Sequence, residues 1–152
     1  MVEGAALEKQ CAGNRTEGSN PSLSASITMN NSGQIPSVQS GNAITDANRG
    51  WFVGDFINES LGLRHSKDVE IKWGQHKAGE ARDEWVTGET RTAIAILIKG
   101  KVEVEFRGHT VLLSQEGDYV MWGEGADHRW RMLEDATVIT VRWPSIMQSE
   151  VR

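Results

Sequence analysis

Residues 92–130 read TAIAILIKGKVEVEFRGHTVLLSQEGDYVMWGEGADHRW, and the fold of the chain is decided in this stretch. Two strand-like runs flank Lys99-Gly100, a second tight connection lies at Arg107-Gly108, and a third run follows Gly117-Asp118. Short strands separated by glycine-containing turns are typical of an antiparallel sandwich or a small barrel. The sequence therefore predicts an all-β domain.

Strand-like alternation continues on both sides of this stretch. Residues 68–74 alternate apolar and charged side chains, and in residues 102–106 the valines and Phe106 are expected to point inward. Residues 92–98 are apolar on both faces, which predicts a strand buried on both sides. With the further runs, about nine strands are expected. No stretch shows helical periodicity, and no internal repeat is found.

Composition limits the classes of function. One domain is expected for 152 residues, and a net charge of −5 argues against a nucleic-acid-binding face. No apolar run is long enough for a transmembrane helix, and the N-terminus lacks the pattern of a secretory signal. Cys11 is the only cysteine, which excludes an internal disulfide and predicts a cytoplasmic protein.

The chain ends are expected to lie outside the domain. Residues 1–28 have neither strand alternation nor a sustained apolar face, which predicts a disordered segment. A second interpretation uses the genetic code: Gly18-Ser19-Asn20-Pro21 is what a transfer-RNA T-arm sequence would encode, so this segment resembles an upstream gene read as protein, with Met29 as the true start. Residues 29–50 are expected to be a flexible lead-in, residues 51–144 the barrel, and residues 145–152 a tail.

The run GDYVMWGEGADH, residues 117–128, resembles the second motif of the cupin superfamily, G-x5-P-x-G-x2-H-x3-N. Gly117, Gly125 and His128 match the motif, Gly123 stands at the proline position, and Met132 replaces the asparagine. The resemblance implies a jelly-roll barrel, the cupin-type double-stranded β-helix. It also implies a homodimer, since cupin-like barrels commonly pair through sheet edges and an N-terminal strand, here residues 51–57.

The first cupin motif, which supplies two histidines and a glutamate to a metal, is degenerate. Counting back from Gly100 places the glutamate position on Ala93 and both histidine positions within residues 86–89, which contain no histidine. Of the usual set of three histidines and one glutamate, only His128 remains. One imidazole holds a divalent ion weakly, so no cofactor is expected. Bound Fe, Mn, Ni or Zn would need His128 together with Glu84, Glu89 or His76.

The candidate site surrounds His128. Strand alternation places His128 beside Trp130 on the barrel interior, and three roles remain open for the imidazole: a structural hydrogen-bonding group, a contact to a ligand, or a metal ligand. Glu84 and Arg82 share a strand face, where they either pair across the mouth or bind an anionic ligand together. The pocket candidates are His128, Trp130, Glu84, Arg82, Trp85 and Tyr119.

The sequence is compatible with three functions. The leading interpretation is a small cupin-like protein that binds an unidentified small molecule in its barrel. The alternatives are a metal-dependent enzyme of dioxygenase or isomerase type with a non-standard ligand set, and a non-catalytic structural or interaction module. The sequence has six tryptophans, which suit a core, a dimer interface or the wall of a ligand pocket.

Overall fold

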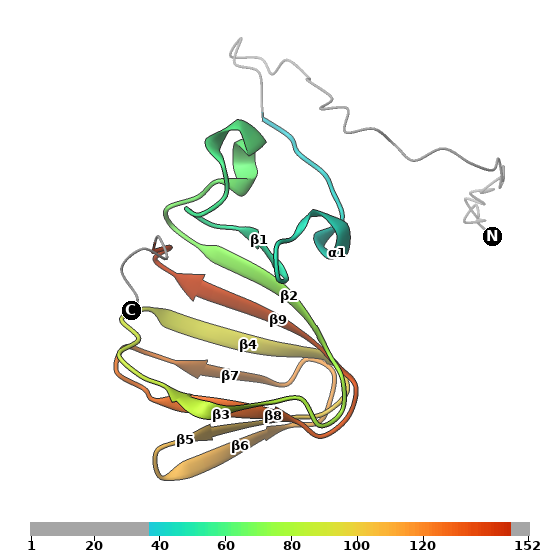
Figure 1. Ribbon diagram of the computed structural model, residues 1–152, viewed down its shortest axis with the longest axis vertical. Coiled ribbons are helices and arrows are strands. Elements are labelled where there is room, and N and C mark those ends of the chain that lie inside the picture. The colour runs from blue at the N-terminus through green and yellow to red at the C-terminus, as the bar shows by residue number, and fades with distance from the viewer. Residues whose placement is uncertain (1–36, 147–152) are drawn as a thin grey trace, which may run out of the picture.

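The computed structural model describes residues 37–146, which fold into two facing antiparallel sheets (Figure 1). The helix α1 (Ala43–Asp46) precedes the first strand, and the 3₁₀ helix η1 (Glu59–Arg64) lies between the first and second strands. The described part of the chain contains nine strands, as the sequence predicts: β1 (Trp51–Val53), β2 (Glu70–His76), β3 (Ala81–Val86), β4 (Thr92–Lys99), β5 (Val102–Phe106), β6 (His109–Leu113), β7 (Tyr119–Trp122), β8 (His128–Met132) and β9 (Ala136–Trp143).

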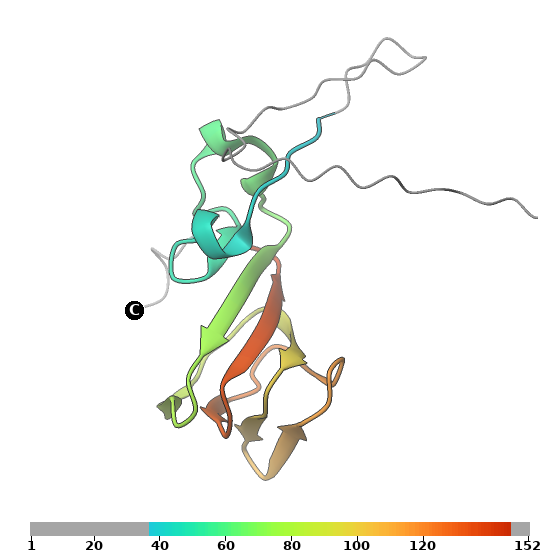
Figure 2. The ribbon, with the colours of Figure 1, turned by 90° about the vertical axis from the view of Figure 1, so that its right-hand side faces the viewer.

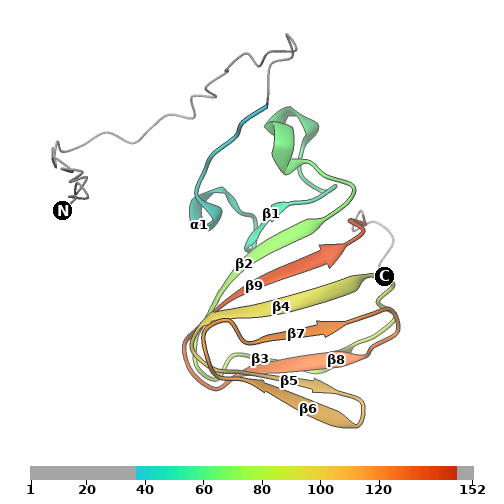
Figure 3. The same cartoon turned by 180° about the vertical axis from the view of Figure 1, so that it is seen from behind.

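The strand order gives the jelly-roll arrangement. The larger sheet has the order β1-β2-β9-β4-β7, and the smaller has the order β3-β8-β5-β6. In each sheet a late strand is inserted between two early ones, β9 between β2 and β4 and β8 between β3 and β5. Figure 2 shows β2 and β9 side by side, and Figure 3 shows the larger sheet above the smaller one. The predicted all-β, cupin-type jelly-roll fold is confirmed.

The inward faces of β5 and β8 are those that alternation predicts. Val102, Val104 and Phe106 are buried in the core, and so are His128 and Met132 at the two ends of β8. Leu97 and Leu113 are the largest apolar side chains with almost no exposed surface, and they fill the barrel between the sheets. A residue pattern of period two was sufficient to place these side chains, because both strands have only one face toward the core.

The two faces of β4 differ, which corrects the prediction that this strand is buried on both sides. Ala93, Ala95 and Leu97 are buried against the second sheet, whereas Ile94 and Ile96 are only half-buried. The smaller sheet covers the inner face alone. The isoleucines therefore pack only against neighbours on the outer face of their own sheet.

The ends of the barrel are more structured than the sequence indicates. The run expected to form a strand over residues 51–57 ends as a strand at Val53, and the following loop contains η1. In the expected C-terminal tail, Ser145 and Ile146 both donate hydrogen bonds to the Glu70 carboxylate, at 3.2 and 3.0 Å.

The expected segment 1–28 and the first part of the lead-in lie outside the described residues. Over residues 37–146 we find no helix with the length and apolarity needed to cross a membrane.

Candidate functional site

A cavity of about 160 Å³ lies between the two sheets. Its apolar wall comes from both sheets and consists of Ala95, Val102, Val104, Met132 and Val138, together with the indoles of Trp122 and Trp130. Its polar wall consists of the cations Lys72, Arg82 and Arg142, the carboxylate Glu89, His76, His128 and the Thr140 hydroxyl. The cavity wall therefore combines apolar side chains with several cations.

Strand register explains why the space exists. Across the larger sheet, Lys72 pairs with Thr140 and Thr140 pairs with Ala95. This inward row therefore has a side chain of a single methyl group on the central strand, before it reaches Val120 of β7. Across the smaller sheet, Arg82 pairs with Trp130 and Trp130 with Val104. Further along β4, Leu97 occupies the corresponding volume. The cavity thus lies where the central strand carries alanine instead of leucine.

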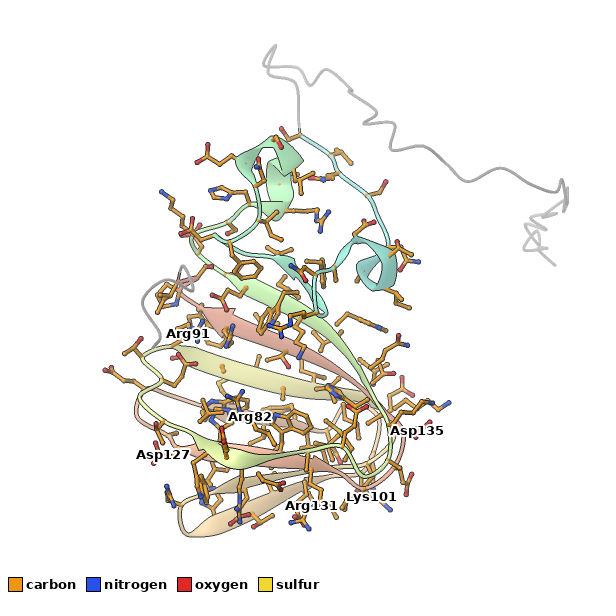
Figure 4. All side chains as sticks on the ribbon, viewed as in Figure 1. Arg82, Arg91, Lys101, Asp127, Arg131 and Asp135 are labelled. Carbon is orange, nitrogen blue, oxygen red and sulfur yellow. The ribbon has the colours of Figure 1, made fainter. Side chains whose placement is uncertain are left out.

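Lys72 is a partly buried cation among other cations. Burial lowers the pKa of Lys72, and the charges of Arg142, Arg82 and Arg49 lower it further, while Glu80 acts in the opposite direction. Within residues 37–146, neither Lys72 nor Arg82 forms an ion pair; Arg82 is labelled in Figure 4. The ammonium of Lys72 lies 5.8 Å from the ring centroid of Trp51, over which the Arg142 guanidinium also stacks at 4.0 Å. These groups form the positively charged end of the cavity.

A buried ionic network fixes one of these cations. Arg91, labelled in Figure 4, donates from Nη1 to both oxygens of Glu70 at 3.0 Å and from Nη2 to Glu89 at 2.7 Å. Arg142 forms a second ion pair with Glu70. Burial alone would raise the pKa of Glu89, but the hydrogen bonds and charge of Arg91 more than offset it and hold this pKa below its usual value. Two carboxylates thus balance two guanidiniums.

His128 is a neutral imidazole on the cavity wall. Burial lowers the pKa of His128, and the charges of Arg82 and Arg142 lower it too, against the hydrogen bond to the Ala126 carbonyl and the charge of Glu89. A carbonyl oxygen only accepts, so Nδ1 of His128 donates to it across 3.2 Å and Nε2 keeps its lone pair. The imidazole packs 4.7 Å from the Trp122 ring, centroid to centroid.

His76 also lines the cavity, whereas strand position alone placed it only near a strand end. Its Nδ1 lies 2.9 Å from a carboxylate oxygen of Glu80, and its ring centroid lies 5.1 Å from that of Trp130. The structure therefore brings four predicted or alternative site residues to one cavity: His128, Trp130, Arg82 and His76. Glu89, the remaining alternative metal ligand that lines it, is occupied by Arg91.

Three other predicted pocket residues lie elsewhere. Glu84 is exposed on β3, and a register irregularity between Arg82 and Val86 separates it from the inward positions of that strand. Trp85 is stacked on the outer side by Arg107, whose guanidinium lies 3.8 Å from the ring centroid. Tyr119 is 62% exposed on β7. None of these three side chains lines the cavity.

The residues of the cavity do not fit a divalent metal. Within residues 37–146 no group of three or more histidine, cysteine, aspartate or glutamate side chains converges in a way that would hold an ion. His76 and His128 line the same cavity, but the nearest carboxylate, Glu89, is engaged by Arg91. Lys72, Arg82 and Arg142 add positive charge where a cation would have to lie. We therefore derive no chemistry through a metal.

Sequence reasoning missed Lys72, Arg142 and Trp51. Lys72 was placed on the face of its strand opposite Val69 and Ile71, which is the correct alternation, but nothing in the pattern identified the charged face as the inward one. Arg142 interrupts the otherwise apolar run ATVITVRW, and a charge in such a strand is the signal that could have identified it. An inward charge needs partners from other strands, which only the fold supplies.

Neither a family model nor a curated protein matches this sequence. Solved structures do match. KdgF from a Halomonas species is 25% identical, with a TM-score of 0.50 over 55% of this chain and 77% of that chain. The cupin domain of Cnp3 from Schizosaccharomyces pombe is 11% identical, with a TM-score of 0.56 over 81% of this chain and 84% of that chain. At 11% identity the second likeness is one of fold alone.

Proposed function

We propose that this chain, which has the fold of the cupin domain that it resembles, binds a small molecule in the cavity between its two sheets. The observation that carries the proposal is the cavity of about 160 Å³ with indole, imidazole and cationic groups on its wall. An engineered apolar cavity of about 150 Å³ in another protein accepts benzene. A molecule with one ring therefore suits the space, and convergent polar groups on an apolar wall are typical of ligand sites.

Ligand-observed NMR with a library of single-ring fragments, neutral and charged, tests this proposal. We expect binders whose signal is lost in Ala95→Leu, because the larger side chain occupies the cavity next to Thr140. Ala81→Leu makes the same change on an exposed position of β3 and is the matched control. Ala95→Val gives a smaller, graded change if the leucine variant does not fold.

Two outcomes would contradict this function. If no fragment binds the wild-type protein, the cavity is a packing defect and the non-catalytic structural or interaction module becomes the better interpretation. If fragments bind Ala95→Leu as well as the wild-type protein, the binding site lies elsewhere on the molecule.

A metal-dependent enzyme of dioxygenase or isomerase type is the second candidate, favoured by one observation: His76 and His128 line the same cavity. Elemental analysis of protein purified without added metal separates the two. We expect well under one equivalent of Fe, Mn, Ni or Zn, because the site lacks a free carboxylate ligand. Stoichiometric metal that disappears in His128→Ala would favour the enzyme.

A further inference from the structure

We propose that the ligand carries an oxyanion, most simply a carboxylate, and that Lys72, Arg82 and Arg142 recognise it. This inference rests on the proposed function, since it assigns the chemical class of the molecule that occupies the same cavity. It is carried by three independent features of the cavity wall: an unbalanced positive charge, hydrogen-bond donors without acceptors, and the grouping of Lys72 and Arg142 over the ring of Trp51.

The positive charge of the cavity is not compensated by the protein. Glu70 and Glu89 balance Arg91 and Arg142 within the buried network. The charges of Lys72 and Arg82 therefore remain, and among residues 37–146 neither side chain has an ion-pair partner. A partly buried cation without a partner is costly, so the Lys72 ammonium favours an anion in the cavity, and the exposed Arg82 adds a second positive charge at the wall.

The cavity wall also contains hydrogen-bond donors that have no acceptor. The indole N–H of Trp122 and the Nε–H of Arg142 are both buried, and neither finds a hydrogen-bond partner within the described part of the chain. Both residues line the cavity. Buried donors in folded proteins are nearly always satisfied, so these two are open to an acceptor from a bound group or a water molecule. Water would satisfy either donor, but it would not neutralise Lys72 and Arg82, whereas an oxyanion does both.

Two of the three cations lie together at one part of the cavity wall. Lys72 and Arg142 come from neighbouring strands and both lie over the ring of Trp51. The apolar wall comes mainly from β5, β8 and β9, with Val102, Val104 and Val138. A ligand with an anionic head and a compact apolar or ring-shaped body matches this arrangement. Guanidinium groups bind planar carboxylates in a fork geometry, which favours a carboxylate as the head group.

Isothermal titration with three probes that share a phenyl ring tests the inference: benzoate, benzamide and phenyl phosphate. We expect benzoate to bind the wild-type protein about tenfold more tightly than benzamide, which has the same shape without the charge. Phenyl phosphate distinguishes a carboxylate site from a phosphate site, because both anions share the oxyanion chemistry. Added salt should weaken the binding of the anions and leave that of benzamide nearly unchanged.

Two variants assign the preference to the named cations. Lys72→Met removes the ammonium and nearly keeps the length of the side chain. Arg82→Gln removes the charge of an exposed residue at the cavity wall. Each is expected to remove most of the preference for benzoate and to leave the affinity for benzamide within about twofold. Lys67→Met removes an exposed lysine outside the cavity and should change neither.

The outcomes separate this inference from the function on which it rests. Benzamide binding as tightly as both anions, or an anion preference that survives Lys72→Met and Arg82→Gln, would overturn the oxyanion assignment and leave ligand binding in place. If none of the three probes binds, while neutral fragments bind and are excluded by Ala95→Leu, the oxyanion assignment fails alone. If no fragment of any kind binds, both proposals fail together.

Discussion

Glu70 shows how a single residue sets the geometry of the whole cavity. Its carboxylate has no exposed surface, and it accepts hydrogen bonds from Arg91, Ser145 and the backbone N–H of Ile146. Because it also pairs with Arg142, it holds that guanidinium against the cavity wall. A buried carboxylate is tolerated only with such partners, so Glu70 couples the stability of the barrel to the position of a ligand-facing cation.

Replacing Glu70 by glutamine should lower the free energy of unfolding by about 3–5 kcal/mol, because two buried guanidiniums lose their shared counter-charge. The measurement is chemical denaturation of both proteins. Glu103→Gln is the matched control: Glu103 pairs with Arg131 at 3.3 Å on the surface, and exposed pairs contribute about 0–1 kcal/mol. Equal losses in the two variants would mean that the buried network does not stabilise the fold.

His128 should make stability depend on pH. Its pKa in the folded state lies below the ordinary value of 6.5, because of burial and the charges of Arg82 and Arg142. The unfolded chain therefore takes up this proton first as the pH falls. The contribution of neutral His128 to stability is present above pH 6.5 and is lost as the pH falls through the folded-state pKa.

Unfolding free energies measured from pH 8 downward check this. The wild-type protein should lose stability below pH 6.5, and His128→Gln should show a shallower loss over the same range, because its side chain does not titrate. His109→Gln removes an exposed histidine on β6 and should keep the wild-type slope. Parallel curves for the wild-type protein and His128→Gln would contradict the assigned direction of the pKa.

At the scale of elements, the connections between strands decide how closely the sheets approach. Gly100 lies in the turn from β4 to β5 with a φ of +94°, and a Cβ atom built there would lie 2.2 Å from the backbone oxygen of Asp135. Gly108, in the turn from β5 to β6, has almost the same φ of +93° but no atom within 4 Å of such a Cβ. A side chain at either position would strain the backbone, but only a side chain at Gly100 would also clash with neighbouring atoms. Comparing the two positions therefore distinguishes the cost of strain from the cost of close packing.

Gly108→Ala should cost about 1–2 kcal/mol, the penalty of a left-handed conformation for a residue with a Cβ. Gly100→Ala should cost clearly more, because the backbone around Asp135 must also move. Thermal unfolding of the two variants beside the wild-type protein measures both values. A similar cost at the two positions would show that the turn after β4 relaxes freely.

At the scale of the whole molecule, the outer face of the larger sheet is apolar. Two rows of side chains cross its four longest neighbouring strands in register, Ile71–Val141–Ile94–Met121 and Trp73–Ile139–Ile96–Tyr119. Met121 and Tyr119 remain 52% and 62% exposed. An antiparallel sheet with only one covered face normally carries polar residues on the other face. An apolar outer face is therefore typical of a surface that contacts a partner.

We propose that a second copy of the chain covers this face in a homodimer. The rows carry no charge, and a twofold axis would place each face against its identical partner, which sheet-on-sheet packing accommodates. The residues 51–57 expected to take part are used within the chain, because Trp51 lines the cavity and Ile57 is buried. The contact is therefore assigned to the outer rows.

Light scattering at micromolar concentration should give twice the chain mass of 16.8 kDa. Tyr119→Arg should shift the population to monomers, since it places a charge in the centre of an apolar contact. Leu112→Arg makes a comparable change at an exposed position of β6, outside the two rows, and should leave the dimer intact. A monomeric wild-type protein would rule out this assembly.

The sequence by itself determined the strands, their inward faces in β5 and β8, the cupin-type fold and the place of His128 on the barrel interior. These follow from local pattern, since the alternation of side chains and the glycine turns are written into neighbouring residues. Only the tertiary structure decided which side chains line the cavity. Lys72, Trp51 and Arg142 lie far apart in the chain and meet because β9 is inserted beside β2. Glu84 is a charged strand residue like Lys72 and Arg142, but it lies outside the cavity on the irregularly paired β3, because pairing between distant strands is not encoded in any local period.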